Sequence, residues 1–330
     1  MDIRNRRGLK EAADRSLAAA SYNPKKLILI HTAAALALSL LVTALDFVLN
    51  TRIAGTGGLG GIELRSVLST VQSVLRLANL VILPFWEAGY TFAAMNIARG
   101  KRAEPGSLLE GFRRWGPVFR ATLFQWLIYM GIAMICLYVS MQIFLITPLA
   151  DPLYEILAPY MTSTAPVLDQ AAMSAATAAC MPMLWIFGVL YALLVVPVVY
   201  QYRMVSYVLL DGPKTGALAA LRESRRIMRG SRFRLFKLDL SFWWFYGAQL
   251  LLALVCYGDA ILPALGIGLP FSDTVSYFLF YILSLAFQMA LYIWLRNRVA
   301  VTYAHGYDVL RGPEAETAAP APPRNQPWSY

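Results

Sequence analysis

The residues of this chain best suited to chemistry are one acid, one amide and three arginines near the ends of apolar stretches. Counting back from glycines at 100, 212 and 312, they are Glu87 (thirteen residues before), Gln201 and Arg203 (eleven and nine), and Arg296 and Arg298 (sixteen and fourteen). A charge at the centre of a bilayer costs about 2.5–3.5 kcal/mol, so such groups usually pair or face water. The spacing predicts an intramembrane polar cluster. A structural ion pair and a ligand site or ion path both stay open, and we expect Glu87 to pair with Arg203 or Arg298.

Two prolines stand at matching places in these stretches. Pro84 and Pro197 precede their glycines by sixteen and fifteen residues. Proline removes a backbone hydrogen bond and kinks a helix, and matched interruptions in corresponding repeats indicate a transporter site. The third stretch has no such proline, and proline is common in membrane helices. We therefore treat both as candidate kinks without assigning them a role.

Motifs of known enzymes do not account for the chain. Residues 55–60 fit G-x-G-x-x-G but follow an apolar stretch and no strand, and the chain has no Walker A loop, H-E-x-x-H or G-x-S-x-G. His31 and His305 lie far apart in sequence, and Cys136, Cys180 and Cys256 lack metal-ligand spacing. We expect no cofactor, no metal and no enzymatic activity, although a lipid-active membrane enzyme would need no linear motif.

Long apolar blocks must position the polar cluster. The chain is 58% hydrophobic and 15% charged, against about 25% charged residues in soluble proteins. A span of a bilayer needs about 20 apolar residues, and its backbone must be hydrogen-bonded internally. The fold is therefore predicted to be all-α, with six transmembrane helices in three hairpins. The blocks are approximately 27–49, 67–98, 118–146, 178–199, 238–262 and 271–295.

The distribution of charge predicts the orientation. Of 29 Lys and Arg residues, 26 lie before the first block, between blocks two and three or at the start of block three (Arg120), between four and five, or after the sixth. The only charged residues in the loops at 147–172 and 260–273 are acids. A Gly-rich turn at 55–61 would close the first hairpin. By the positive-inside rule both termini are cytoplasmic. The net charge of +10 is thus explained by topology and contact with anionic headgroups, and we expect no nucleic-acid partner.

Three basic, amphipathic segments precede the hairpins. Residues 1–24 would form a helix lying on the membrane, with Leu9, Ala12, Ala13 and Leu17 on its apolar face. The other two segments begin near Leu108 and Leu218, and their arginines are predicted to contact headgroups: Arg113, Arg114, Arg225, Arg226 and Arg229. We infer one membrane domain, residues 1–312, of three pseudo-repeats at about 1–100, 101–212 and 213–312. A Pro/Ala-rich cytoplasmic tail, residues 313–330, is predicted to be disordered.

The stretches that follow the third basic segment resemble one bacterial family. The chain reads Met-Arg-Gly at 228–230, Phe-Arg-Leu-Phe at 233–236 and Leu-Asp-Leu-Ser-Phe at 238–242. The multi-pass membrane family catalogued as domain of unknown function 975 typically reads Met-Lys-Gly, Trp-Arg-Leu-Phe and Leu-x-Leu-Ser-Phe. Residues 7–12, 98–112 and 210–213 are also similar, so the resemblance reaches about residue 312. It implies the fold and a bacterial plasma membrane but supplies no activity. Glu87 is not part of the family's pattern.

Three functions remain open from the sequence. A non-catalytic scaffold or accessory subunit, with a membrane protein as partner, is favoured because basic interfacial segments are abundant and catalytic motifs are absent. A transporter or permease for a small polar or amphipathic solute is the alternative, because of the pseudo-repeats, prolines and polar cluster. A lipid-active membrane enzyme is the third.

Overall fold

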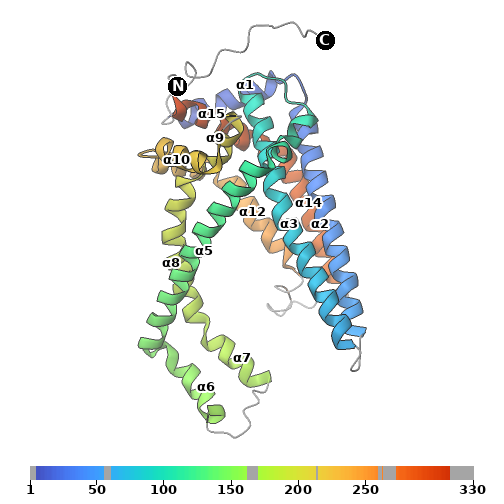
Figure 1. Cartoon of the computed structure of the whole chain (residues 1–330), viewed down its shortest axis with the longest axis vertical. Helices are drawn as coiled ribbons and strands as arrows, with labels where there is room; N and C mark the ends of the chain where they lie inside the picture. The colour runs from blue at the N-terminus through green and yellow to red at the C-terminus, as the bar shows by residue number, and fades with distance from the viewer. Residues whose placement is uncertain are drawn as a thin grey trace. The chain divides into compact units, whose positions relative to one another are not determined.

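Every regular element in the described part of the chain is a helix, which confirms the all-α fold class (Figure 1). The computed structural model describes residues 5–55, 61–161, 170–212, 215–258, 262 and 273–312. Most of the Gly-rich turn at 55–61, the tail at 313–330 and Pro213 lie outside these ranges, so the predictions made for them stay predictions.

The chain divides into two compact units, which the predicted repeats do not follow. Unit 1 comprises residues 1–121 and 204–330, and unit 2 comprises residues 122–203. The division into three pseudo-repeats stays a prediction.

Unit 1 holds both terminal parts of the chain. Its elements are α1 (Arg6–Ala18), α2 (Pro24–Gly55), α3 (Gly61–Ala98), η1 (Pro105–Leu109), α4 (Glu110–Arg113), α9 (Val205–Asp211), α10 (Ala217–Ile227), α11 (Arg232–Leu240), α12 (Trp243–Cys256), α14 (Asp273–Leu291), the π-helical segment η3 (Tyr292–Arg296) and α15 (Asn297–Arg311). Helix α2 packs along α3, α15 packs on α1 and α3, and α12 packs on α14. The centre is a buried cluster that includes Leu27, Ile28, Tyr90, Leu108 and Val301.

Unit 2 begins within α5 (Trp115–Ile146), which starts in unit 1. It continues through η2 (Pro148–Ala150), α6 (Asp151–Met161), α7 (Gln170–Ala179) and α8 (Met181–Gln201). Helices α6 and α7 pack on each other. The described residues of the loop expected at 147–172 are therefore largely helical, since acids and small apolar residues are compatible with a helix.

Five helices are long and apolar enough to cross a membrane, which supports an integral membrane protein. Within the described residues they are 24–49, 66–98, 115–146, 171–211 and 275–311. A sixth candidate is the pair α11 and α12, whose axes meet at 67°. The expected continuous block at 238–262 is thus bent near Ser241. The count of six spans and their pairing into hairpins stay predictions.

The apolar faces of the basic segments are buried in protein, and whether the first segment also lies on the membrane stays a prediction. On α1, Leu9 and Ala13 are 0% exposed, and the helix packs against α15 and α3. On α10, Ala220 and Leu221 are buried, and the helix packs on α9. Periodicity identifies an apolar face, but lipid and a neighbouring helix satisfy that face equally well.

Candidate functional site

Glu87 and Arg296 form an ion pair in unit 1. Glu87 lies on α3, and its Oε2 accepts a hydrogen bond from Nη2 of Arg296 at the end of η3. The side chain of Glu87 is 50% exposed and that of Arg296 15%. The guanidinium also lies over the rings of Tyr90 and Tyr292, at 4.8 and 4.4 Å from their centroids. Arg296 is thus held by one carboxylate and two aromatic faces.

His31 of α2 completes this cluster from the buried side. Its Nε2 lies 3.6 Å from Oε1 of Glu87, and its side chain is 1% exposed. The ring stacks on Trp86 and contacts Tyr90, with centroids 5.4 and 4.7 Å apart. The Nε1 of Trp86 donates to the backbone oxygen of His31 at 2.9 Å. At 3.6 Å the imidazole and the Glu87 carboxylate are close but not hydrogen-bonded, and neither ring nitrogen of His31 has a hydrogen-bond partner within the described residues. Arg296 stabilises the negative charge of the carboxylate.

The structure assigns Arg298 a different partner from the one expected. Its Nη2 donates to Oδ2 of Asp14 on α1 at 2.7 Å. The predicted pairing of Glu87 with Arg298 is therefore wrong, because Arg296 takes that place. Gln201 and Arg203 belong to unit 2, where the neighbouring Tyr202 oxygen accepts a hydrogen bond from Gln125. Their grouping with Glu87 stays a prediction.

A second ion-pair network, missed in the sequence, joins residues that immediately precede the three glycines. Nη1 of Arg99 donates to Oδ1 of Asp211 at 2.6 Å, and its Nη2 donates to Oδ1 of Asp308 at 2.5 Å. Arg311 bonds the other oxygen of Asp211, as does the Tyr307 hydroxyl at 3.1 Å. Counting back one residue from Gly100, Gly212 and Gly312 gives Arg99, Asp211 and Arg311, so the same spacing could have found this network.

This network balances its own charges. It contains two arginines and two aspartates, and the Asp211 side chain is 11% exposed. Burial lowers the pKa of Arg99, but hydrogen bonds to Asp308 and Asp211 outweigh it, so that pKa is raised above its ordinary value. The arrangement supports a structural role at the point where α3, α9 and α15 end.

The helices continue through both candidate kink residues. Pro84 lies inside α3, three residues before Glu87, and Pro197 lies inside α8. Whether either proline serves a site stays a prediction. On the Arg296 side of the ion pair the helix is irregular, because the π-helical turn η3 ends at Arg296.

The predicted headgroup arginines occupy two kinds of place. Arg114 donates to Oε1 of Glu110 at 2.9 Å and to the backbone oxygens of Leu209 and Leu210 at 2.9 and 3.1 Å. It therefore caps the end of α9. The other four, Arg113, Arg225, Arg226 and Arg229, are exposed.

Two of these exposed arginines also have an acidic partner on their own helix, and Arg113 lies 3.5 Å from Glu110 on α4. Arg226 donates to both oxygens of Glu223 at 2.8 and 2.6 Å. These bonds lower the pKa of Glu223 below its ordinary 4.5. Among the described residues, no three His, Cys, Asp or Glu side chains come together as a metal site would require.

Three comparisons place the chain among known proteins. Residues 1–311 match the model of the family described as "Protein of unknown function (DUF975)". A search of curated proteins and a search of solved structures each found no match. The family match confirms the resemblance carried by the motifs at 228–242.

Proposed function

The chain belongs to the DUF975 family, and from this premise we propose that it is a non-catalytic scaffold or accessory subunit. It would act in the bacterial plasma membrane with both termini in the cytoplasm. The alternation of basic and acidic loops supports this orientation. The five or six membrane-length helices support the location.

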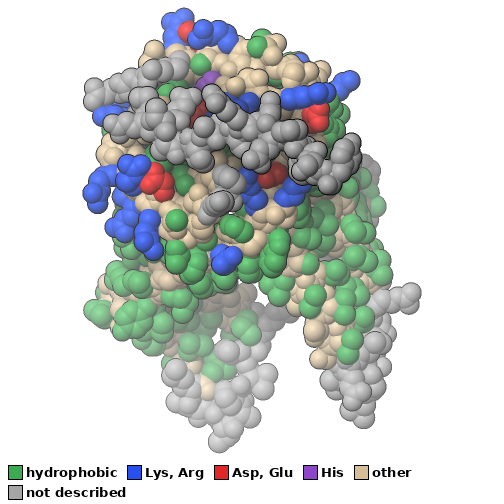
Figure 2. All heavy atoms as spheres, turned by 45° about the horizontal axis from the view of Figure 1, so that its top comes forward, with side chains coloured by type: hydrophobic (Ala, Val, Ile, Leu, Met, Phe, Trp, Pro, Cys, Tyr) green, Lys and Arg blue, Asp and Glu red, His purple; other side chains and the backbone are tan. Residues whose placement is uncertain are grey.

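The observation that carries the proposal is the way α10 is fixed. Its apolar face, including Ala220, Leu221 and Ile227, is buried in unit 1, while Arg225 and Arg226 on the same helix are exposed. Figure 2 shows Lys and Arg side chains gathered toward the end of unit 1 that carries α1 and α10, and hydrophobic side chains along its long helices. A rigidly held basic surface beside apolar spans suits a contact with acidic groups of a partner or of lipids.

Charge reversal tests the scaffold directly. We compare the wild type with a double variant, Arg225→Glu and Arg229→Glu, and with Glu87→Gln. All three are cross-linked in native membranes and sized on a native gel. The double variant is expected to lose a larger assembly that the wild type forms, while Glu87→Gln retains it. Arg226 is left unchanged so that its pair with Glu223 keeps α10 intact.

Two results would contradict the scaffold. One is a wild-type chain that migrates without a partner. The other is loss of the assembly on Glu87→Gln but not on charge reversal. Normal elution of each variant in detergent is the control for folding.

A transporter for a small polar or amphipathic solute is the second candidate, and the Glu87 cluster favours it. Glu87 is half exposed within an apolar span, with Pro84 on one side and the π-helical η3 on the other. An ionisable residue within a membrane span usually marks a functional site, and π-helical turns are frequent at functional sites. If Glu87→Gln impaired the function of the protein in cells while the assembly stayed intact, the transporter would be favoured over the scaffold.

A further inference from the structure

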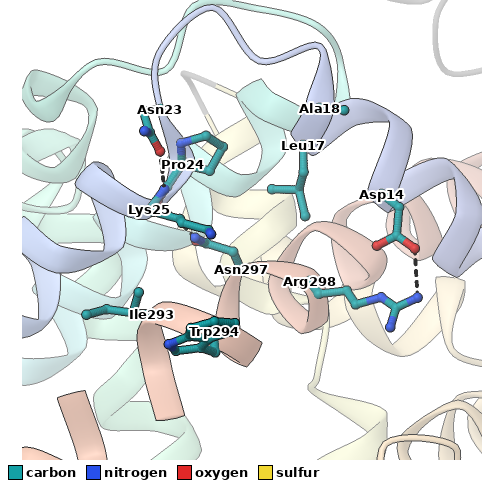
Figure 3. A pocket seen from close by; sticks show the side chains of 10 residues that line it. All are labelled: Asp14, Leu17, Ala18, Asn23, Pro24, Lys25, Ile293, Trp294, Asn297 and Arg298. Carbon is teal, nitrogen blue, oxygen red and sulfur yellow. Dashed lines mark hydrogen bonds and ion pairs between the residues drawn. The ribbon is translucent and has the colours of Figure 1, made fainter. Parts of the chain in front are cut away.

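A groove in unit 1, distinct from the Glu87 cluster, combines cations with apolar surface. It lies where the connection from α1 to α2 passes over η3 and the start of α15, and its volume is about 440 Å³. Figure 3 shows Leu17 reaching into it from α1, with Lys25 on one side and Arg298 on the other. We call it the Lys25 groove. None of its residues takes part in the Glu87 ion pair or in the Arg99 network.

The charge of the Lys25 groove is positive. Its lining contains Lys25, Arg298 and one acid, Asp14. Asp14 accepts from Nη2 of Arg298, whereas Nε of Arg298 is buried and has no hydrogen-bond partner within the described residues. Burial lowers the pKa of Lys10, and the positive charge of the nearby Arg298 lowers it further. The groove therefore has more cationic than anionic groups and would be stabilised by a bound anion.

The ammonium of Lys25 lies over an aromatic ring and forms no ion pair within the described residues. Its Nζ lies 5.3 Å from the ring centroid of Trp294. In the described part of the chain no carboxylate pairs with it. The backbone around it is fixed, because Oδ1 of Asn23 accepts from the Lys25 amide at 2.9 Å and Nδ2 of Asn297 donates to the Pro24 oxygen at 2.9 Å. The cation therefore needs little rearrangement to meet an anion.

The apolar part of the groove faces outward. Trp294 is 75% exposed, and Leu17 and Ile293 also line the groove. Pro24 is the first residue of the apolar span 24–49, so Lys25 and Trp294 lie at the boundary of the hydrocarbon if that helix crosses the bilayer. Tryptophan is enriched at this boundary, and lipid phosphates lie just beyond the hydrocarbon core.

From these contacts we infer that the Lys25 groove binds an anionic glycerophospholipid. Lys25 and Arg298 contact the phosphate, and Trp294 contacts the glycerol and the first part of the acyl chains. The inference rests on the membrane placement proposed above. It adds a defined lipid site to a chain for which only diffuse headgroup contact had been expected. The shared chemistry is a phosphate group, and the amphipathic lining favours one carried by a lipid over one free in solution.

Native mass spectrometry of the full-length protein in mild detergent tests the site. The protein is titrated with phosphatidylglycerol, with phosphatidylcholine, and with glycerol 3-phosphate as a soluble phosphate. The wild type is expected to retain one phosphatidylglycerol in preference to phosphatidylcholine. Lys25→Gln should weaken this binding about fivefold, since one Lys or Arg near an anionic surface contributes about a factor of this size. Trp294→Ala should weaken lipid binding as well.

The matched control is Lys26→Gln, which removes the same charge at the next, exposed residue. It should leave binding unchanged, because Lys26 does not line the groove. Equal loss in the Lys25 and Lys26 variants, or equal retention of the two lipids, would overturn the inference in favour of diffuse surface charge. Competition by glycerol 3-phosphate would overturn it in favour of a soluble ligand. Since the purified chain is used alone, failure here is separate from failure of the scaffold assembly.

Discussion

Asp211 accepts bonds from three side chains, those of Arg99, Tyr307 and Arg311. Two of these are arginines, and Asp308 supplies the second negative charge through Arg99. Because the Asp211 side chain is only 11% exposed, water can replace few of these hydrogen bonds when the carboxylate is removed. The stability of the junction between α3, α9 and α15 therefore depends strongly on this one acid.

We expect Asp211→Asn to lower the free energy of unfolding by about 1–3 kcal/mol, since it leaves two partly buried guanidinium groups with a neutral acceptor. Thermal unfolding in detergent measures the loss. The control is Glu104→Gln, which breaks the ion pair between Glu104 and Arg102. Their side chains are 52% and 79% exposed, respectively. It should change stability by no more than about 1 kcal/mol. Equal effects of the two changes would contradict the structural role of Asp211.

Counting back from the glycines identified Glu87 as the acid of an ion pair, but Arg298 is not its partner; Arg296 is. Arg296 and Arg298 are two residues apart, which places them about 200° apart around an α-helix. Counting from Gly312 could not choose between them, and the π-helical turn of η3 changes the count just before Arg296. His31 was missed because it lies 56 residues before Glu87 and only packing of α2 on α3 brings the two together.

The backbones of the second basic segment and of α3 approach each other closely, which explains how the segment is held against α3. A Cβ added at Gly111 of α4 would lie 1.9 Å from the backbone oxygen of Phe85, and one at Gly89 would lie 1.8 Å from that of Leu108. Two glycines on facing elements thus allow close packing that no larger residue permits. The amphipathic pattern predicted a helical segment here, but it could not show that α3 covers its apolar face in place of lipid.

Gly111→Ala is expected to destabilise the protein by about 1–3 kcal/mol, because the added methyl group must displace the backbone of α3. The matched control is Gly106→Ala in the neighbouring η1, where an added Cβ meets nothing within 4 Å. Unfolding of both variants in the same detergent gives the comparison. If Gly111→Ala unfolds as the wild type does, the close packing of α4 on α3 is not required for stability.

The number of spans decides on which side of the membrane the chain ends. Five helices could cross by themselves, and the bent pair α11–α12 could supply a sixth crossing. The block pattern predicted a continuous span at 238–262 because apolar composition continues through Ser241, whereas the bend depends on local backbone geometry that composition does not record. Six crossings return the C-terminus to the cytoplasm, and five leave it outside.

Labelling of single cysteines distinguishes these cases. With Cys136, Cys180 and Cys256 replaced by Ser, one cysteine is introduced as Ser107→Cys, as Ser174→Cys or after Tyr330. A membrane-impermeant maleimide added to intact cells should label Ser174→Cys alone, because the basic segments on either side of residues 147–172 hold their own ends of the spans in the cytoplasm. Lysis should then expose the other two. A C-terminal cysteine labelled before lysis would show that α11 and α12 do not cross together, and a labelled Ser107→Cys would reverse the proposed orientation and place the Lys25 groove on the outer leaflet.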